Sequence, residues 1–342
     1  MRGHYLFTAI SWLIVCFSWQ PLLARDKEIR RALPVDGDTL VAPAASLASQ
    51  DAPEISENPR VASRASVALT PSSLSALAIY PSAAPVTIAS SAMMVDARTG
   101  AIIFFKNPDV RRPVASTQKL LTALLVAEHG GLDSRVRVAT DDCAVEPTKL
   151  GFRPGDLYTK RELLAAMLVH SCNDAAVCLA RNDAGSVEAF ARLMNEKALS
   201  LGAASSHFVN PNGLPKSGQF STARDMARIA FAAYHNPTLR QFVCLPGLIF
   251  TYSSGRRRFL TPTNKLVTRS TIFNGMKTGY TDASGRCLVS SACDRGRDVI
   301  LVQLGGTHRT LWDDAQRLLL WGLESGSSTA FATNESIGNS IR

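Results

Sequence analysis

Strand-like patterns at both ends of the region from Val86 to about Ser325 enclose a long helix-like middle, and this arrangement restricts the fold most. Near its start, two short apolar runs flank a turn at Thr99-Gly100, which is typical of a β-hairpin. After the helical middle, two strand patterns cover 286–292 and 299–304, and an amphipathic helix pattern covers 311–323. We therefore predict an α+β domain over 86–325 whose sheet draws strands from both ends of the sequence.

The middle of this region has the periodicity of helices. An apolar helix is predicted from Pro113 to Glu128, closed by Gly130-Gly131. Further helical stretches are predicted over 161–182, 186–201 and 221–234, and Thr222 is expected to cap the last of them.

The residues before this domain have the composition of an export signal and a tether. Arg2 and an apolar run from Tyr5 to Trp19 predict a signal peptide over 1–24, so we expect an exported protein of the periplasm or extracytoplasmic cell envelope. An uncleaved signal that keeps the protein in contact with the membrane is the alternative. Residues 25–85 are rich in Ala, Ser and Pro and predict a disordered linker, and 326–342 predict a flexible tail.

Charge and cysteine content narrow the possible partners. The net charge of +9 suits an anionic partner or simply a soluble surface, and no nucleic-acid-binding motif accompanies it, so no nucleic-acid partner is expected. No C-x-x-C motif and no Cys/His cluster with zinc spacing occurs, so we expect no metal and no cofactor. Disulfides and free thiols both remain open for the six cysteines after the signal, which are Cys143, Cys172, Cys178, Cys244, Cys287 and Cys293.

The first chemical motif is S-x-x-K, formed by Ser116 and Lys119 at the start of the predicted apolar helix. Residues three apart on a helix project from the same face. A serine hydroxyl needs a base to become a nucleophile, and a lysine becomes a base when burial lowers its pKa. The apolar flanks of this helix predict such burial, so we expect a serine nucleophile with a lysine base.

Two further short motifs follow in order along the chain. Ser171 and Asn173 form S-x-N after an apolar run, where the hydroxyl can relay a proton and the amide can hold a substrate carbonyl. Lys277-Thr278-Gly279 forms K-T-G, and we expect it on an edge strand, with the Lys and Thr side chains meeting a carboxylate. Gly279 leaves no side chain between the strand backbone and a ligand, so a substrate strand can add to this edge.

With these three motifs in order, the chain resembles the low-molecular-mass D-alanyl-D-alanine carboxypeptidases, serine peptidases of the penicillin-binding superfamily. The resemblance runs from about Val86 to Leu323 and includes the stretches 210–214, 221–226 and 275–285. It implies a β-lactamase/transpeptidase-like fold, in which helices flank an antiparallel sheet and the cleft lies between that sheet and an all-helical subdomain.

The resemblance also implies the reaction. The enzyme would remove the terminal D-alanine from peptidoglycan stem pentapeptides through an acyl-enzyme, and β-lactam antibiotics would inhibit it covalently. Ser116 would attack the peptide carbonyl, Lys119 would accept its proton, and Ser171 would pass a proton to the leaving D-alanine.

Substrate binding is implied for the remaining motif residues. Asn173 would orient the substrate amide, and Lys277 and Thr278, followed by Gly279, would bind the side with the terminal carboxylate. The backbone N–H groups of the nucleophile and of Tyr280 would form the oxyanion hole. Members of the family often carry an arginine before the last helix that helps to bind the carboxylate, and Arg309 is the nearest candidate here.

Three other functions share these motifs in whole or in part. A D,D-endopeptidase, which cuts cross-links, has identical motifs and stays open as the alternative. A class A β-lactamase needs a Glu on a loop after S-x-N, whereas Glu188 and Glu196 lie on a helical pattern here. A non-catalytic penicillin-binding protein of the cell wall is disfavoured by the intact Ser116 and Lys119.

Overall fold

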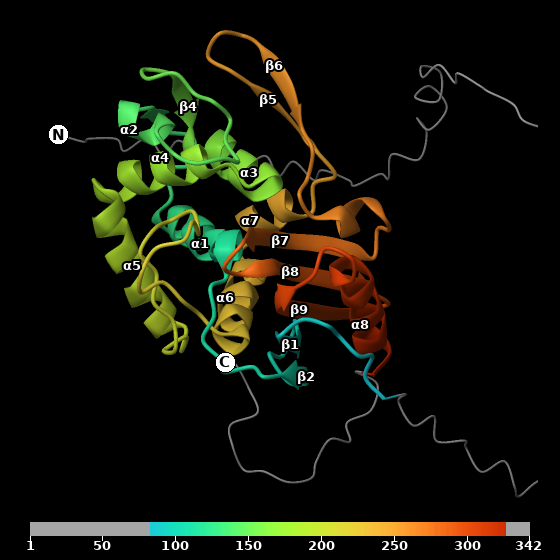
Figure 1. Cartoon of the computed structure of the whole chain (residues 1–342). Coiled ribbons are helices and arrows are strands. Elements are labelled where there is room, and N and C mark those ends of the chain that lie inside the picture. The colour runs from blue at the N-terminus through green and yellow to red at the C-terminus, as the bar shows by residue number, and fades with distance from the viewer. Residues whose placement is uncertain (1–82, 326–342) are drawn as a thin grey trace, which may run out of the picture. The chain divides into compact units, whose positions relative to one another are not determined.

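The computed structural model describes residues 83–325, and its centre is one antiparallel sheet (Figure 1). The strand order is β2-β1-β9-β8-β7, so the first two strands of this region lie beside the last three. This confirms the predicted hairpin and the predicted origin of the sheet. The strands are β1 (Ser91–Asp96), β2 (Ile102–Lys106), β7 (Phe273–Thr281), β8 (Gly285–Asp294) and β9 (Arg297–Gly306).

Three predicted segments lie outside the described residues. They are the signal peptide (1–24), nearly all of the linker (25–85) and the tail (326–342). Residues 83–85, at the end of the predicted linker, belong to no helix or strand. Within 83–325, no helix is both long enough and apolar enough to cross a membrane.

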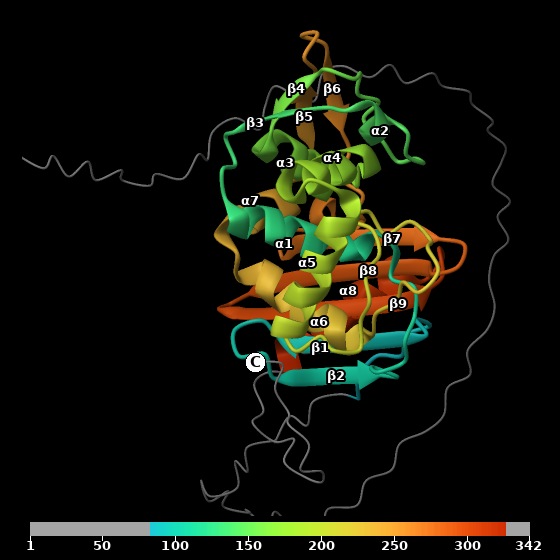
Figure 2. The ribbon, with the colours of Figure 1, turned by 90° about the vertical axis from the view of Figure 1, so that its left-hand side faces the viewer.

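Helices cover both faces of the sheet (Figure 2). One face packs against α8 (Leu311–Ser325), with Leu288 of β8 and Leu301 of β9 in the shared buried cluster. The other face packs mainly against α6 (Ala223–His235) and α7 (Pro237–Val243), and α3 (Lys160–His170) contacts β7. The other helices between β2 and β7 pack on these and on one another, and they are α1 (Lys119–His129), α2 (Thr140–Cys143), α4 (Asn173–Ala184) and α5 (Val187–Ser200).

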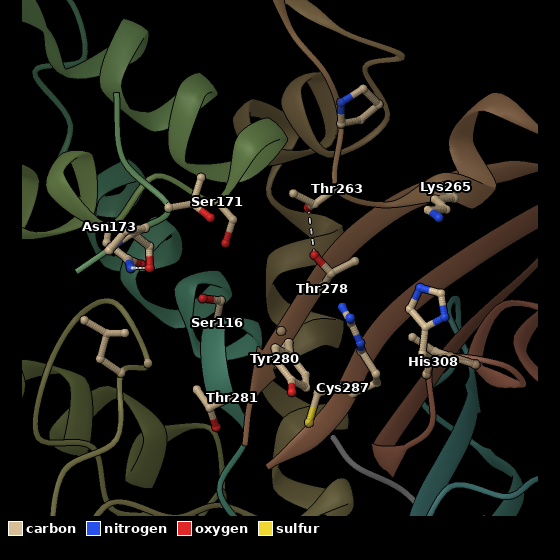
Figure 3. Close-up of a pocket in the computed structure, with 18 of the residues that line it drawn as sticks. Ser116, Ser171, Asn173, Thr263, Lys265, Thr278, Tyr280, Thr281, Cys287 and His308 are labelled. Carbon is tan, nitrogen blue, oxygen red and sulfur yellow. Dashed lines mark hydrogen bonds between the residues drawn. The ribbon is translucent and has the colours of Figure 1, made fainter. Parts of the chain in front are cut away.

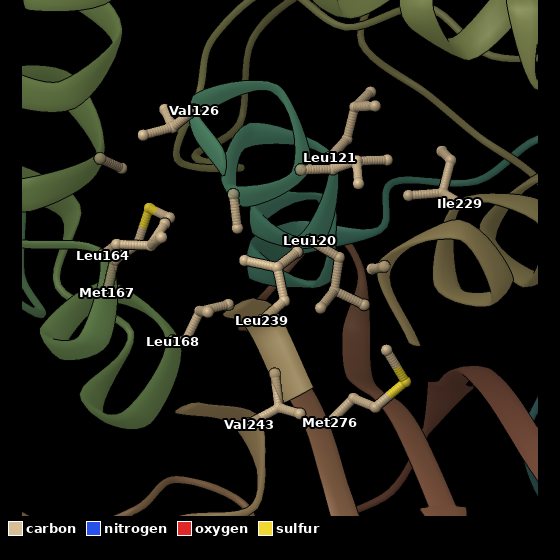
Figure 4. Packing of buried hydrophobic residues seen from close by; sticks show 14 of the residues in the cluster. Leu120, Leu121, Val126, Leu164, Met167, Leu168, Ile229, Leu239, Val243 and Met276 are labelled. Carbon is tan, nitrogen blue, oxygen red and sulfur yellow. The ribbon is translucent and has the colours of Figure 1, made fainter. Parts of the chain in front are cut away.

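The apolar helix α1 lies at the centre of the main core, and eight of its eleven residues are buried. Figure 4 shows its side chains surrounded by those of four other elements, α3, α6, α7 and β7. A helix that is apolar on every side is expected to be buried in this way. The labelled members of this cluster are Leu120, Leu121, Val126, Leu164, Met167, Leu168, Ile229, Leu239, Val243 and Met276.

Helix boundaries agree with the sequence where a cap defines them. Thr222 accepts a hydrogen bond from Asp225 N and caps α6, as predicted. The predicted helical stretch 161–182 consists of two helices, separated at Ser171, whose φ of 65° lies in the left-handed region and ends α3. The helix predicted from Pro113 begins instead with a 3₁₀ turn, η1 (Ala115–Gln118), that leads directly into α1.

Between β2 and β7 the structure also contains two small two-stranded sheets that the patterns did not predict. β3 (Arg135–Arg137) pairs with β4 (Leu157–Thr159), and β5 (Leu248–Thr251) pairs with β6 (Arg257–Leu260). The helical subdomain is therefore not entirely helical. Strands of three or four residues are too short to show a clear alternation of apolar and polar side chains.

All six cysteines of the described region are free thiols. Cys172, Cys178 and Cys287 are buried, so they act as small apolar side chains in the core.

Candidate active site

Ser116 lies in η1 and Lys119 is the first residue of α1, so one turn carries both side chains. The Lys119 side chain is fully buried, and its Nζ lies 2.8 Å from Ser116 Oγ. It also contacts Asn173 Oδ1 at 2.6 Å and the carbonyl oxygen of Asn212 at 2.7 Å. The structure therefore confirms that the S-x-x-K residues meet on one face and that the lysine is buried.

Burial lowers the pKa of Lys119 well below its usual value of 10.5, and the positive charge of Lys277 lowers it further. Both effects disfavour the ammonium form, because it would lose hydration and lie near a like charge. A neutral amine next to the serine hydroxyl can take its proton.

A loop around Gly213 fixes the turn that carries the nucleophile. Ala115, directly before Ser116, has a left-handed φ of 48°, which is unfavourable for a residue with a Cβ. Gly213 lies against this turn so closely that a Cβ there would come within 2.2 Å of the Ala115 carbonyl oxygen. Gln118 Nε2 holds the same loop by donating to the Asn210 carbonyl oxygen at 2.5 Å.

Asn212 is a site residue that the sequence did not assign. Its carbonyl oxygen accepts hydrogen bonds from Lys119 Nζ and from Ser116 Oγ, the latter at 3.2 Å. Because the contact is made by the main chain, the side-chain type carries no signal for it. The stretch 210–214 stands out in the sequence only as part of the family resemblance.

The S-x-N motif lies opposite, at the junction of α3 and α4. Ser171 lines the cleft, and Asn173 begins α4 and is buried. The Asn173 amide is engaged at both ends, because Oδ1 accepts from Lys119 and Nδ2 donates to the carbonyl oxygens of Glu146 and Pro147. Asn173 therefore fixes the lysine amine in addition to lining the cleft.

The K-T-G motif lies on β7, an edge strand of the sheet, as predicted. Thr278 lines the cleft, and its Oγ1 donates to Thr263 Oγ1 at 2.7 Å. Lys277 departs from the prediction: its side chain is fully buried, does not line the cleft, and donates from Nζ to the Thr278 carbonyl oxygen at 2.9 Å. Side chains alternate faces along a strand, so Lys277 lies on the face of β7 that it shares with Gly279, and Thr278 lies on the other face.

Burial lowers the pKa of Lys277 from 10.5 to about 7. Below about pH 7 Lys277 is mostly protonated, and its positive charge then lowers the pKa of Lys119.

These motifs meet in one cavity of about 490 Å³ between the helical subdomain and the sheet (Figure 3). Ser116, Ser171 and Asn173 line it from the helical side, and Thr278 and Tyr280 line it from β7. A Cβ on Gly279 would lie 2.9 Å from the Ser116 backbone nitrogen, so this glycine lets β7 run directly past the nucleophile.

The cavity is also lined by residues that the motifs did not identify. Lys265, Arg286 and His308 contribute ionisable groups, and Trp312 contributes an aromatic ring. Arg309, the arginine suggested by the resemblance, is exposed and is not among the lining residues. Within 83–325, no group of three or more His, Cys, Asp or Glu side chains is arranged to hold a metal ion.

Comparison with known proteins agrees with this geometry. Residues 80–308 match the family model described as D-alanyl-D-alanine carboxypeptidase. The chain belongs to this family. The match confirms the family and the serine hydrolase activity that the three motifs predicted, and it spans all of the motif residues.

Relatives named for two related activities are similar to this chain. A D-alanyl-D-alanine carboxypeptidase of Mycobacterium tuberculosis is 34% identical over 236 residues, which are 67% of this chain and 80% of that protein. A D-alanyl-D-alanine endopeptidase of Escherichia coli is 34% identical over 269 residues, which are 76% of this chain and 85% of that protein.

Solved structures confirm the penicillin-binding fold. A crystal structure of a D-alanyl-D-alanine carboxypeptidase from Mycobacterium tuberculosis has a TM-score of 0.69 at 31% identity, covering 76% of this chain and 100% of that one. The Streptomyces K15 DD-transpeptidase has a TM-score of 0.67 at 28% identity, covering 70% of this chain and 99% of that one.

Proposed function

We propose that this protein removes the terminal D-alanine from peptidoglycan stem pentapeptides through an acyl-enzyme at Ser116. The contact of 2.8 Å between Lys119 Nζ and Ser116 Oγ inside a buried site is the observation that supports this most strongly. It supplies a nucleophile and a base in hydrogen-bond reach, which is the arrangement that activates a serine.

Acylation begins when Ser116 Oγ attacks the carbonyl carbon of the penultimate D-alanine. The hydroxyl proton passes to the neutral Nζ of Lys119, whose other contacts to Asn173 and Asn212 fix its position. Negative charge develops on the carbonyl oxygen, and the backbone N–H groups of Ser116 and Tyr280 stabilise it. The close approach of Gly279 to the Ser116 nitrogen supports this role, because it brings the two backbones together.

The C–N bond then breaks, and the leaving amine of D-alanine takes a proton through Ser171. Water hydrolyses the ester, which releases the shortened peptide and restores the Ser116 hydroxyl. Thr278, hydrogen-bonded to Thr263 on the ligand side of β7, binds the carboxylate of the leaving D-alanine.

β-Lactam antibiotics would acylate the same serine, because a strained cyclic amide can take the place of the peptide bond. A stable ester at Ser116 is then the expected inhibited form.

We also propose that the protein is exported and works in the extracytoplasmic cell envelope, where peptidoglycan is found. Arg2 and the apolar run from Tyr5 to Trp19 support export. N-terminal sequencing of the protein from its native envelope tests this. We expect a mature chain that begins at Arg25. A chain that retains Met1 and is found in the membrane fraction would favour an uncleaved anchor. Recovery of the protein in the cytoplasm would contradict export.

Muropeptide digestion tests the proposed activity. Purified protein is incubated with a monomeric pentapeptide stem, and the products are separated by mass. The expected product has lost one alanine residue, and free D-alanine appears in equal amount. A Ser116→Ala variant serves as the control, and an unchanged pentapeptide with wild-type protein would contradict the proposal.

A further inference from the structure

A second pocket, with a volume of about 280 Å³, adjoins the active-site cavity. Gly213 and Thr281 line both spaces, so the two meet at these residues. The walls of the second pocket are the segment before Ser116, the loop that follows Gly213, and the turn after β7. Its lining residues include Val114, Ala115, Pro215, Lys216, Thr281 and Ala283.

The path of the substrate along β7 leads toward this pocket. The proposed reaction places the carboxylate of the leaving D-alanine at Thr278 and the scissile carbonyl at the backbone N–H of Tyr280. Figure 3 shows Thr278, Tyr280 and Thr281 in succession along β7, beside Ser116. A peptide that adds to this edge therefore runs antiparallel to β7, and the residues before its scissile bond continue past Tyr280. The third residue of the stem, which precedes the penultimate D-alanine, comes to lie at Thr281 and the second pocket.

The walls of the second pocket are fixed by side-chain hydrogen bonds. Asn210 Nδ2 and Gln219 Nε2 both donate to the Leu214 carbonyl oxygen, each at 2.9 Å, and they hold the loop in place. On the opposite wall, Thr281 Oγ1 donates to Ser284 Oγ at 2.9 Å. A pocket that is already formed loses little conformational entropy when a ligand enters it.

The second pocket combines apolar surface with one cation. Val114 and Ala115 are buried and line it beside Pro215, so an aliphatic chain can pack there. Lys216 is exposed and is the one charged residue of the described chain that lines the pocket.

The charge of Lys216 is available to a ligand. Lys216 forms no ion pair with any residue in the range 83–325. The nearby Asp282 does not line the pocket, and its Oδ1 accepts from the Tyr280 hydroxyl at 2.7 Å. An unpaired ammonium attracts a carboxylate and disfavours a side chain that ends in a second ammonium.

Resting on the proposed acyl-enzyme at Ser116, we propose that the second pocket binds the side chain of the third stem residue and selects its chemistry. Lys216 favours a diamino dicarboxylic residue, whose side chain ends in an ammonium and a carboxylate, over lysine, whose side chain ends in an ammonium alone. The Lys216 ammonium donates to that carboxylate, and the aliphatic part of the side chain packs against Val114 and Pro215. No bond is made or broken in this pocket, so it acts on substrate choice.

The test compares four substrates. Three are pentapeptide stems whose third residue is a diamino dicarboxylic acid, the same acid with its side-chain carboxylate amidated, or lysine. The fourth is acetyl-D-alanyl-D-alanine, which has no third residue. Release of D-alanine gives kcat and KM for each.

Wild type should prefer the dicarboxylic stem over the amidated and lysine stems by roughly three- to tenfold, because an exposed charge-assisted hydrogen bond is partly screened by water. The difference should appear in KM, since the third residue is bound equally before and during acylation. Lys216→Gln should abolish this preference and leave the acetylated dipeptide unaffected. High salt should reduce the preference of wild type in the same way.

A second variant tests the pocket by its shape. Ala283→Phe places a large side chain in the pocket, so it should raise KM for all three pentapeptides and leave the acetylated dipeptide unaffected. Arg257→Gln is the control for charge, because Arg257 is exposed on β6 and lines neither cavity. It should keep the preference of wild type.

Two results would overturn the inference while the carboxypeptidase activity stands. One is equal kcat/KM of wild type for the three pentapeptides. The other is a preference that Lys216→Gln retains, or a loss in Lys216→Gln that is equal for all four substrates. Failure of wild type to release D-alanine from any of the four would instead overturn the proposed function itself.

Discussion

Asn173 Oδ1 lies 2.6 Å from Lys119 Nζ, and this contact joins the S-x-N motif to the S-x-x-K motif inside the protein. The contact links two elements, α4 and α1, whose first residues are Asn173 and Lys119. Because the amide is neutral, it orients the amine without favouring its protonated form as a carboxylate would. The type of side chain at position 173 should therefore set the pH range in which the lysine acts as a base.

Asn173→Asp places a negative charge beside Lys119 and should raise the pKa of that amine. The neutral amine is the base, so the rate of acylation rises with pH as the ammonium loses its proton, and a higher pKa moves this rise to higher pH. We measure the acylation rate by a fluorescent penicillin from about pH 5 to 10, a range that brackets the titration of a lysine with a lowered pKa. The midpoint for Asn173→Asp should exceed that of wild type. Asn173→Ala is the control, which should slow acylation without an upward shift.

Lys119→Arg tests whether proton acceptance is required. Arginine keeps a positive charge at every working pH and cannot act as a base. If Lys119 is the base, acylation by penicillin should fall by about 100-fold or more, which is the usual contribution of a general base. Circular dichroism checks that the variant is folded. A folded variant that acylates within a few-fold of wild type would exclude the general-base role.

Gly213→Ala tests the close packing of the loop against the nucleophile turn. The new Cβ would lie 2.2 Å from the Ala115 carbonyl oxygen, so either the loop or the turn must move, and acylation should be lost or strongly reduced. Gly155→Ala is a matched control. Gly155 has a similar positive φ of 91°, against 82° at Gly213, but a Cβ at Gly155 would meet no atom within 4 Å.

Both glycine variants should lose some stability from the unfavourable backbone conformation, on the order of 1 kcal/mol. Only Gly213→Ala should also lose acylation. Equal acylation rates in the two variants would show that the close packing at Ala115 does not matter for the nucleophile.

The lowered pKa of Lys277 predicts how the free energy of unfolding depends on pH. Its pKa is about 7 in the folded protein and 10.5 when unfolded, so between these values the unfolded chain binds a proton that the folded chain does not. The contribution of Lys277 to the free energy of unfolding therefore rises as the pH increases from about 7 to 10.5, and it is constant below about pH 7. Lys277→Met removes this dependence.

Urea unfolding of wild type and Lys277→Met at about pH 7, 8 and 9 measures the effect, because these values fall between the folded and unfolded pKa. The free energy of unfolding of Lys277→Met should exceed that of wild type most at the lowest of the three pH values. This excess should shrink as pH rises. A difference that stays the same at all three pH values would contradict the buried, neutralised lysine.

The sequence predicted the parts of this site that depend on side-chain type and spacing. Ser116 and Lys119 meet because residues three apart on a helical turn share a face, and the apolar flanks predicted the burial of the lysine. Thr278 and Gly279 were predicted on an edge strand, and β7 is one. These features are local, so a short stretch of sequence contains them.

The parts that the sequence did not predict depend on main-chain contacts or on distant segments. Asn212 acts through its carbonyl oxygen, which every residue type possesses. Arg286 and His308 join the cavity because β8 and the segment before α8 come beside β7 in the fold. The burial of Lys277 depends on which face of β7 packs against the core, and the short motif alone does not contain that information.

The most direct test of Ser116 as the nucleophile is the mass of the protein after incubation with benzylpenicillin. Wild-type protein should gain the mass of one penicillin molecule, and peptide fragmentation should place this mass on Ser116. Ser116→Ala should remain folded and gain no mass. An adduct on any other residue, or equal labelling of Ser116→Ala, would contradict the assignment of Ser116 as the nucleophile.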